Sequence, residues 1–424
     1  MNRHTTSGFQ SALLSSWALL FGFGILMIGD GLQGTLLAVR ADLEGFSTTT
    51  TGIIMSSFYL GFLVGSILTP RIVISVGHIR VFAALAALAS AAILVHALFI
   101  STAVWIGLRL ISGFCLAGLY VVAESWLNDK ATNETRGQIL SLYMIVTYIG
   151  VAIGQLFLNY ADPSGFQLFI LISILISVAV IPLLLSAGAT PSFEEPSGLN
   201  LIELIQISPV GSIGMFIIGF VSAAFFSVGP VYAKQIGLDL ELISYFMAIA
   251  VVGTIILQWP IGYLSDHFDR RHVMVIVTLF AACSAIACSV ISTTSIVFLL
   301  LFVGVFGGLS LPLYSLCVAY TNDRLEPSQM VAASGSLVLI SGIGAVLGPI
   351  LVSALMEHLG TSYFFLSLGF VLLFMTVFTL VRIISRKTAT KSSASVLIPS
   401  AYHNTSIAYD HSQSNVEDDT HMEN

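Results

Sequence analysis

Three charged residues of this 424-residue sequence stand inside long apolar stretches, where a charge usually serves a function. Asp30 lies in the first of these stretches, Arg109 in the fourth, and Glu124 near the end of that fourth stretch. A charge at the centre of a membrane costs roughly 2.5–3.5 kcal/mol on insertion scales, so such residues usually mark an ion or substrate path. A neighbouring arginine favours an ionised carboxylate, whereas burial favours the protonated form. This competition predicts that Asp30, paired with Arg109 or sharing a water-filled cavity with it, takes up and releases a proton.

Each of these charges also has a purely structural interpretation. Asp30 and Arg109 could form a buried ion pair that only holds two helices together. Glu124 could form a salt bridge with Lys130 or Arg136 near the inner surface, and a role in substrate binding or gating is the alternative for it.

Uncharged polar side chains on the apolar stretches are a second set of candidates. They could line a cavity for a solute, or they could join helices through hydrogen bonds worth about 0.6 kcal/mol each in a membrane. The candidates are Gln33, Tyr59, Tyr143, Tyr148, Gln155, Asn159, Gln258 and Tyr314.

The composition shows what kind of protein must position these residues. Hydrophobic residues make up 56% of the chain and charged residues only 9%, against about 25% charged in soluble domains. A water-soluble fold is therefore excluded, and a net charge of -7 without a basic cluster excludes nucleic acid as a partner. Lipid offers no hydrogen-bond partners to the backbone, so the sequence predicts an all-α membrane protein embedded in the bilayer.

Twelve apolar runs are long enough to cross a bilayer, which takes about 20 residues. The first six predicted helices are 17–39, 50–70, 80–100, 103–126, 138–158 and 167–186. The second six are 209–231, 242–264, 273–291, 295–318, 331–355 and 362–384.

Lysine and arginine residues indicate the orientation of these helices. With both termini in the cytoplasm, the outer loops contain only Arg40 and Lys234, Arg109 lies within a helix, and the rest of the 15 basic residues lie on the inner side. Cytoplasmic loops carry such an excess, so we predict that both termini are cytoplasmic.

Proline, glycine and charge between the sixth and seventh helices divide the chain almost in half. Within this connection, residues 199–207 could form a short interfacial helix. The polar C-terminal tail lacks apolar periodicity and is predicted to be disordered. The predicted organisation is a cytoplasmic N-terminus (1–16), a first six-helix bundle (17–186), a linker (187–208), a second bundle (209–384) and a tail (385–424).

The two halves resemble each other in register. Asn128-Asp129-Lys130 returns as Asn322-Asp323-Arg324 after 194 residues, and the same shift takes Gly150 to Gly344 and Gly154 to Gly348. Earlier in each half the shift is 192, and it takes Gly61 to Gly253. Both halves start on the same side of the membrane. A parallel repeat of this kind predicts a substrate site between the halves.

A polar motif follows the eighth helix, in the predicted inner loop. It contains Gly262 and Asp266 and ends in Arg270 and Arg271. An aspartate at a helix end can pair with a basic loop residue or face the positive end of a neighbouring helix. The motif therefore predicts a latch that holds the cytoplasmic side shut, although an anchor with a helix cap is the simpler alternative.

The corresponding loop of the first half is incomplete. It keeps Gly77 and Arg80, but Ile74 stands at the position of the aspartate. A charged latch is therefore expected in the second half only.

These motifs resemble those of the major facilitator superfamily. The loop motif, preceded by Gln258-Trp259-Pro260, is similar to the loop signature of that family, and Arg109 followed by Gly113 and Gly118 is similar to its fourth-helix signature. The resemblance covers residues 15–385. It implies two pseudo-symmetric six-helix bundles, a substrate site between them, alternating access and transport linked to protons.

Two finer resemblances refine this prediction. The stretch 118–128, with Arg136-Gly137 and Gln258-Trp259-Pro260, looks like the YcaD-type branch of bacterial facilitators, which implies a permease of the bacterial inner membrane. The stretch 342–349 resembles the glycine-proline signature of drug antiporters. That signature belongs in the fifth helix, whereas here it lies in the eleventh.

Motifs for other chemistry are missing from the sequence. It has no Walker loop, no His-Glu-x-x-His motif and no nucleophile elbow, and its 4 cysteines lack metal-ligand spacing. We predict no catalytic residues, no metal and no cofactor. The predicted function is proton-coupled transport of a small organic solute by a monomer, with export preferred. The alternative is a transport-inactive receptor or scaffold of the same fold.

Overall fold

The computed structural model describes residues 2–130, 136–185, 201–291 and 295–385. Twelve helices in these ranges are long and apolar enough to cross a membrane, which confirms the predicted all-α membrane fold. The elements of the first half are α1 (Asn2–Leu43), α2 (Thr48–Val76), α3 (His78–Leu98), α4 (Thr102–Lys130), α5 (Arg136–Leu156), the short 3-10 helix η1 (Phe157–Tyr160) and α6 (Gln167–Leu185). Those of the second half are α7 (Leu201–Ile207), α8 (Pro209–Gln235), α9 (Leu240–His267), α10 (Arg270–Ile291), α11 (Ile296–Ser310), α12 (Leu313–Asn322), α13 (Pro327–Leu359) and α14 (Tyr363–Ser385).

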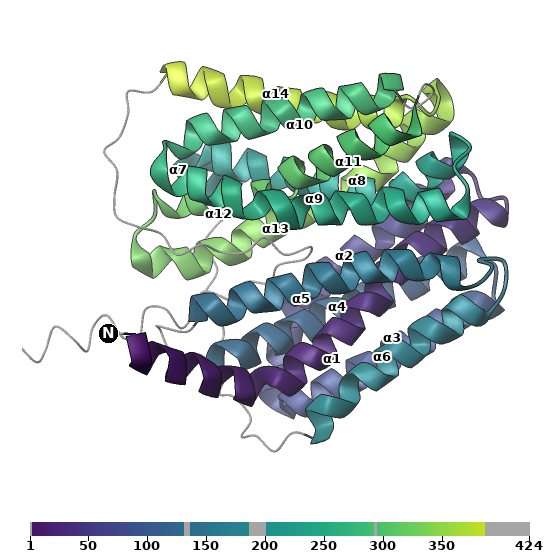
Figure 1. Ribbon diagram of the computed structural model, residues 1–424, viewed down its shortest axis with the longest axis horizontal. Helices are drawn as coiled ribbons and strands as arrows, with labels where there is room; N and C mark the ends of the chain where they lie inside the picture. The colour runs from purple at the N-terminus through teal and green to yellow at the C-terminus, as the bar shows by residue number, and fades with distance from the viewer. Residues whose placement is uncertain (1, 131–135, 186–200, 292–294, 386–424) are drawn as a thin grey trace, which may run out of the picture.

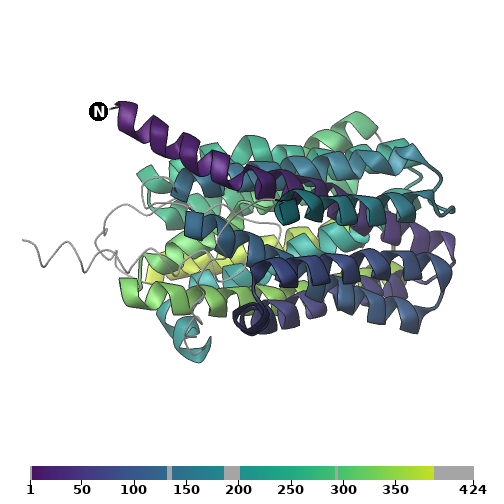
Figure 2. The same cartoon turned by 90° about the horizontal axis from the view of Figure 1, so that it is seen from below.

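The helices form two bundles that lie side by side. Figure 1 shows α1–α6 as the lower bundle and α8–α14 as the upper one. Viewed from below, the long helices run roughly parallel, and the start of α1 projects at one end (Figure 2). We call the end at which the chain starts the proximal end, and the opposite end, where α1 ends and α2 begins, the distal end.

Close glycine contacts show that the two bundles are built alike. A Cβ atom on Gly154 would overlap the backbone of Ile28, where α5 crosses α1. A Cβ atom on Gly348 would overlap the backbone of Phe220 in the same way, where α13 crosses α8. Glycines let helix backbones approach closely in membranes. The internal repeat seen in the sequence therefore corresponds to equivalent helix crossings.

The first distal turn is also repeated. Gly45 and Gly237 have φ angles of 77° and 90°, a conformation that glycine adopts without steric cost. Two residues later, the side chains of Ser47 and Asp239 accept hydrogen bonds from the first turns of α2 and α9. Equivalent turns thus reverse the chain in each half.

Three elements differ from the sequence prediction. The predicted N-terminal segment 1–16 is helical from Asn2 onward and continues into the first span as α1. The predicted helix 295–318 is interrupted between α11 and α12, because Pro312 has no backbone N–H to continue the hydrogen-bond ladder. The connection after α9 is only Phe268 and Asp269, because both flanking helices extend further than predicted.

The central connection contains the short helix that the sequence suggested within 199–207. It is α7, whose Leu204 is buried whereas Ile202 and Ile205 are exposed. The rest of the predicted linker up to residue 200, and the predicted tail from residue 386, lie outside the described residues.

Polar contacts between the bundles gather toward the distal end. Lys234 Nζ lies 2.6 Å from Asp42 Oδ2, joining the ends of α8 and α1. The backbone N–H of Thr49 donates to Glu357 Oε2 at 2.6 Å. Further hydrogen bonds join Gln235 to Thr48, Asn159 to Ser244, and Ser56 to the carbonyl of Val346. These contacts hold the two bundles together at the distal end.

Candidate functional site

A cavity of about 60 Å³ lies between the two bundles. That volume accommodates a few water molecules, so a larger solute requires the bundles to move apart. Three predicted candidates, Tyr59, Tyr148 and Tyr314, line it. The other lining residues are Phe62 and Leu63 of α2, Ile218, Gly219 and Ser222 of α8, Leu311, and Val338, Ser341, Gly342 and Ala345 of α13.

The chemistry of this central cavity is apolar and aromatic. Among the described residues that line it, none is charged, and the polar groups are hydroxyls of tyrosine and serine. The hydroxyl of Ser222 donates to the carbonyl of Ile218 at 2.7 Å, so its oxygen can still accept a hydrogen bond. The cavity can accept hydrogen bonds and stack against a ring, but it offers no counter-ion to a charged solute.

Asp30 faces a second, smaller cavity of about 10 Å³. This cavity lies inside the first bundle, because its walls come from α1, α2, α3, α4 and α6. Its lining residues are Leu26, Asp30, Gln33, Phe58, Ala89, Ser112, Leu116, Leu119 and Ile176. Gln33, predicted to face the solute, therefore lies beside Asp30 instead of in the central cavity.

Arg109 is buried next to the Asp30 cavity. Only 4% of Arg109 is exposed, and its guanidinium carbon lies 4.2 Å from the centre of the Phe58 ring, over its face. Its charge also acts on Asp30 and Tyr59. A cation over an aromatic face is stabilised by the electron-rich ring. Asp30 and Arg109 thus belong to one electrostatic site within the first bundle.

Aromatic rings connect this charged site to the central cavity. The Phe58 ring contacts Tyr59 edge-on at 5.3 Å between ring centres and lies 6.3 Å from Phe62. Phe58 lines the Asp30 cavity, whereas Tyr59 and Phe62 line the central cavity. A movement of Phe58 would therefore change the packing at both the Asp30 cavity and the central cavity.

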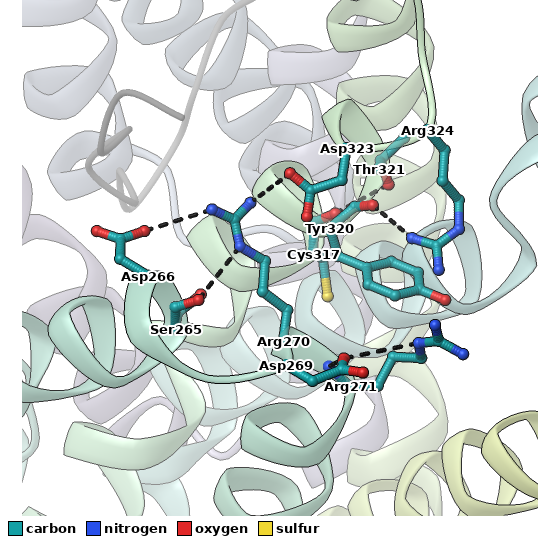
Figure 3. Close-up of polar contacts among 10 residues, drawn as sticks. All are labelled: Ser265, Asp266, Asp269, Arg270, Arg271, Cys317, Tyr320, Thr321, Asp323 and Arg324. Carbon is teal, nitrogen blue, oxygen red and sulfur yellow. Dashed lines mark hydrogen bonds and ion pairs between the residues drawn. The ribbon is translucent and has the colours of Figure 1, made fainter. Parts of the chain in front are cut away.

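The motif after α9 forms an ion-pair cluster within the second bundle (Figure 3). Arg270 at the start of α10 lies 3.3 Å from Asp266 and 3.0 Å from Asp323. Arg271 lies 3.6 Å from Asp269, and Arg324 packs over the ring of Tyr320. The ion pairs of Arg270 join α9 and α10 to the end of α12, three elements of the second bundle.

Asp266 was expected in a loop, and this expectation is wrong. Gly262, assigned to the same motif, already fell within the predicted helix 242–264. Both residues lie in the last turns of α9. Asp323, the second acid of the cluster, was missed as a site residue. The repeat Asn128-Asp129-Lys130 to Asn322-Asp323-Arg324 could have pointed to it, since it places an acid at the end of the matching helix in each half.

The sequence model of the Major Facilitator Superfamily matches residues 19–250 and 211–404 of the chain. The chain belongs to the Major Facilitator Superfamily. This is a family of transporters, so the protein is a multi-pass membrane transporter and not an enzyme. The uncharacterized MFS-type transporter YcaD of Escherichia fergusonii is 27% identical over 362 residues, covering 84% of this chain and 94% of YcaD. YcaD of Escherichia coli matches to the same extent.

Solved structures of this superfamily share the fold. The nucleoside transporter NupG has a TM-score of 0.69 and 15% identity, and the match covers 90% of this chain and 99% of NupG. A bacterial homologue of the human lysosomal transporter Spinster, solved inward-facing and unoccupied, has a TM-score of 0.64 and 15% identity, covering 90% and 96%. At this identity the likeness shows the fold alone.

The first-half loop of this superfamily member differs from the second. Gly77 has a φ angle of 95° and links α2 directly to α3, which requires glycine. Ile74 and Arg80 are exposed, and no ion pair of Arg80 is found among the described residues. His78, close to the position that Arg270 takes in the second half, lies 3.0 Å from Ser125.

The remaining candidates do not line the central cavity of this facilitator. Gln155 accepts a hydrogen bond from Thr35 inside the first bundle. Tyr143 is buried, with its ring centre 4.9 Å from that of Phe23. Gln258 is half-buried on α9, and Asn159 belongs to the distal contacts.

Glu124 is buried deeper than expected for a residue near the inner surface. It is 4% exposed, and its charge acts on Tyr120 and Tyr143. The side chains of Lys130 and Arg136, with which a salt bridge was considered, lie outside the described residues.

The sequence analysis did not identify the residues of α13 that line the central cavity, and these residues lie on one face of the helix. On α13, Val338, Ser341, Gly342 and Ala345 follow the i, i+3, i+4, i+7 spacing of a single face. Residues with this spacing occur on every side of an apolar helix. The spacing alone therefore does not predict which side faces the other bundle.

Proposed function

We propose that this protein is a proton-coupled secondary transporter that moves a small, uncharged organic solute by alternating access. One observation carries the proposal: the described lining of the cavity between the bundles is aromatic and uncharged, and the ring of Phe58 at the Asp30 cavity contacts the ring of Tyr59 at the central cavity. A charged solute would find no counter-ion in the central cavity. Its transport would therefore be opposed by the cost of burying a charge.

The coupling works through the charged site. Asp30 is the proton-carrying group in this proposal, and Arg109 is the cation that compensates its carboxylate. When Asp30 is protonated, Arg109 loses part of its electrostatic partner. Because Arg109 stacks on Phe58, that change reaches Tyr59 and Phe62 at the central cavity. Glu124 is a further proton or gating group of the same bundle.

The orientation follows from the positions of the basic residues. Arg71, Arg80, Arg270, Arg271 and Arg382 belong to the proximal end, whereas Arg40 and Lys234 belong to the distal end. By the positive-inside rule, the proximal end faces the cytoplasm, together with both termini. The distal contacts then close the outer side of the bacterial inner membrane, and the cavity receives solute from the cytoplasm.

The cavity is built from the two halves of one chain, so a monomer is sufficient. The stretch 342–349 resembles an antiporter signature and favours export as the direction. The Arg270 cluster, with Gly262 and Arg271, keeps the proximal ends of α9, α10 and α12 together while the bundle moves as one body.

Proton flux into proteoliposomes tests this function. Vesicles containing the full chain and a trapped pH-sensitive dye receive a panel of small aromatic alcohols, amines and acids. We expect an alcohol or another neutral solute to cause a proton flux that Asp30→Asn abolishes. Asp162→Asn, in an exposed loop, is the matched control. If no solute causes flux, and none binds the purified protein, the chain is a transport-inactive receptor or scaffold. A transport-inactive protein would also be consistent with the first-half loop, which lacks the aspartate of the motif.

A further inference from the structure

Two buried polar atoms beside Asp30 have no hydrogen-bond partner in the part of the chain that the structure describes. They are Nε2 of Gln33 and Oγ of Ser112. Gln33 is 6% exposed and Ser112 is 4% exposed. Both residues line the same 10 Å³ cavity as Asp30.

Unpaired polar atoms are unusual at this depth. Buried side-chain donors and acceptors are nearly always satisfied by the protein or by ordered water. Here the two atoms belong to residues of different helices, α1 and α4, and both residues line a common cavity with Asp30. The remaining walls are apolar and come from Leu26, Phe58, Ala89, Leu116, Leu119 and Ile176.

The size and chemistry of the cavity select a water molecule. A cavity of roughly 10–15 Å³ holds one water, provided that two to four polar partners surround it. Gln33, Ser112 and Asp30 supply three. A metal cation would also find oxygen atoms here, but the positive charge of Arg109 acts on the same carboxylate and opposes a second cation.

We propose that one water molecule occupies this cavity, held by Gln33 and Ser112, and donates a hydrogen bond to the Asp30 carboxylate. The proposal rests on the proposed function, in which Asp30 carries the proton. Gln33 and Ser112 are then positioning residues, since they act on Asp30 through the water. A hydrogen bond to an ionised carboxylate stabilises the charged form, so the water keeps Asp30 from protonating too readily.

The effect of the water on the protonation of Asp30 can be measured only if the other titratable groups around Asp30 stay unchanged. They are Arg109 and Tyr120 from α4 and Tyr59 from α2. The cavity residues contributed by α3 and α6, Ala89 and Ile176, do not titrate. Substitutions at Gln33 and Ser112 leave all of these groups in place.

Infrared difference spectroscopy of the full chain in lipid membranes tests the proposal. The carbonyl band of a protonated carboxylic acid is followed against pH, and its loss in Asp30→Asn assigns it to Asp30. We expect Ser112→Ala and Gln33→Leu each to move the pH midpoint of this band upward by about one unit, because a charge-assisted hydrogen bond is lost. Ser112→Thr keeps the hydroxyl and should keep the midpoint.

A second readout reports the water itself. A weakly bonded O–H stretching band should shift in water labelled with heavy oxygen and disappear in Ser112→Ala. Ser173→Ala, at another buried serine of the first bundle, should leave both bands unchanged. Unchanged midpoints in Ser112→Ala and Gln33→Leu, without a label-sensitive band, would overturn the water site.

The test separates this proposal from the function on which it rests. If the wild type shows no Asp30 carboxyl band at any pH, the proposed proton site is wrong, and the label-sensitive band still decides whether the water is present. If sodium chloride shifts the Asp30 band whereas choline chloride does not, the cavity binds a cation, and the water proposal is overturned.

Discussion

Asp42 and Lys234 occupy equivalent positions in the two halves and form an ion pair with each other, with Lys234 Nζ 2.6 Å from Asp42 Oδ2. Both precede the same glycine turn, which contains Gly45 in the first half and Gly237 in the second. The repeat thus places one acid and one base on either side of the pseudo-symmetry axis at the distal end. Because the equivalent positions carry opposite charges, the turn of the first half can form an ion pair with the matching turn of the second half.

The first prediction concerns this pair. Lys234→Glu places two carboxylates together, and we expect it to favour opening of the distal end. Exposed or half-exposed ion pairs contribute about 0.2–1 kcal/mol, so the open population should rise by a few-fold. The rate at which an impermeant thiol reagent, added on the distal side, labels a single cysteine placed at Ser222 measures this opening.

The charge swap controls the first prediction. Asp42→Lys combined with Lys234→Asp restores an ion pair of opposite polarity, and labelling should return toward the wild-type rate. Equal labelling in the wild type, in Lys234→Glu and in the swap would show that this pair has no part in closing the distal end.

The second prediction concerns Gly52, where α2 meets α13 at the distal end. A Cβ atom at this position would lie 2.6 Å from the carbonyl oxygen of Pro349 and would overlap the Ser353 side chain. Backbone atoms cannot yield as a flexible side chain does, so Gly52→Ala must push the two bundles apart. We expect faster distal labelling than for Lys234→Glu, and a lower melting temperature in detergent.

Gly34 provides the matched control. It lies on α1, and a Cβ atom there would meet nothing within 4 Å. Gly34→Ala should keep the wild-type labelling rate and gain up to about 1 kcal/mol in stability, because alanine favours a helix more than glycine does. If Gly52→Ala behaves like Gly34→Ala, the α2–α13 contact does not limit opening.

The third prediction concerns the charge of the solute. Tryptophol, tryptamine and indole-3-acetate share an indole ring and differ in being neutral, cationic and anionic. Since the described lining of the central cavity is uncharged, tryptophol should raise the melting temperature of the purified protein the most. Tyr314→Ala should weaken this effect, because it removes an aromatic wall. Stronger stabilisation by the amine or the acid would contradict an uncharged site.

The fourth prediction concerns pH and the Arg270 cluster. Burial raises the pKa of Asp323 above its ordinary value of 3.8, and the attraction of Arg270 and Arg324 offsets this only in part. The folded state therefore binds the Asp323 proton more tightly than the unfolded state does. The stability that this proton contributes is present at low pH and is lost as pH rises through the raised pKa.

Asp323→Asn should remove this dependence. The variant should gain stability relative to the wild type as pH rises from about 4 toward neutral, since asparagine keeps the shape without the buried charge. Melting temperatures of both proteins across that range measure the difference. A variant that loses stability relative to the wild type with rising pH would show that the ion pair outweighs burial.

Parts of the candidate site could be read from the sequence because a buried charge in an apolar helix stands out on its own. Asp30 and Arg109 were found in this way, whereas the Arg270 motif was found as a polar motif that resembles a family signature. Tyr59, Tyr148 and Tyr314 were found as polar groups on apolar helices, but so were Gln155, Tyr143 and Gln258, which do not line the central cavity. The sequence does not distinguish these two groups, since all of them sit on helices that are apolar on every side.

By itself, the sequence determined the number of spans, the division into two halves and the repeat between them, because length, hydropathy and register are properties of the chain alone. Only the tertiary structure decided that Gln33 lies beside Asp30, that Phe58 connects the charged site to the aromatic lining of the central cavity, and that Asp42 pairs with Lys234. These relationships depend on how each helix is rotated about its axis and how the two bundles meet. In a membrane that rotation is set by packing between helices, because lipid gives an apolar helix no preferred face.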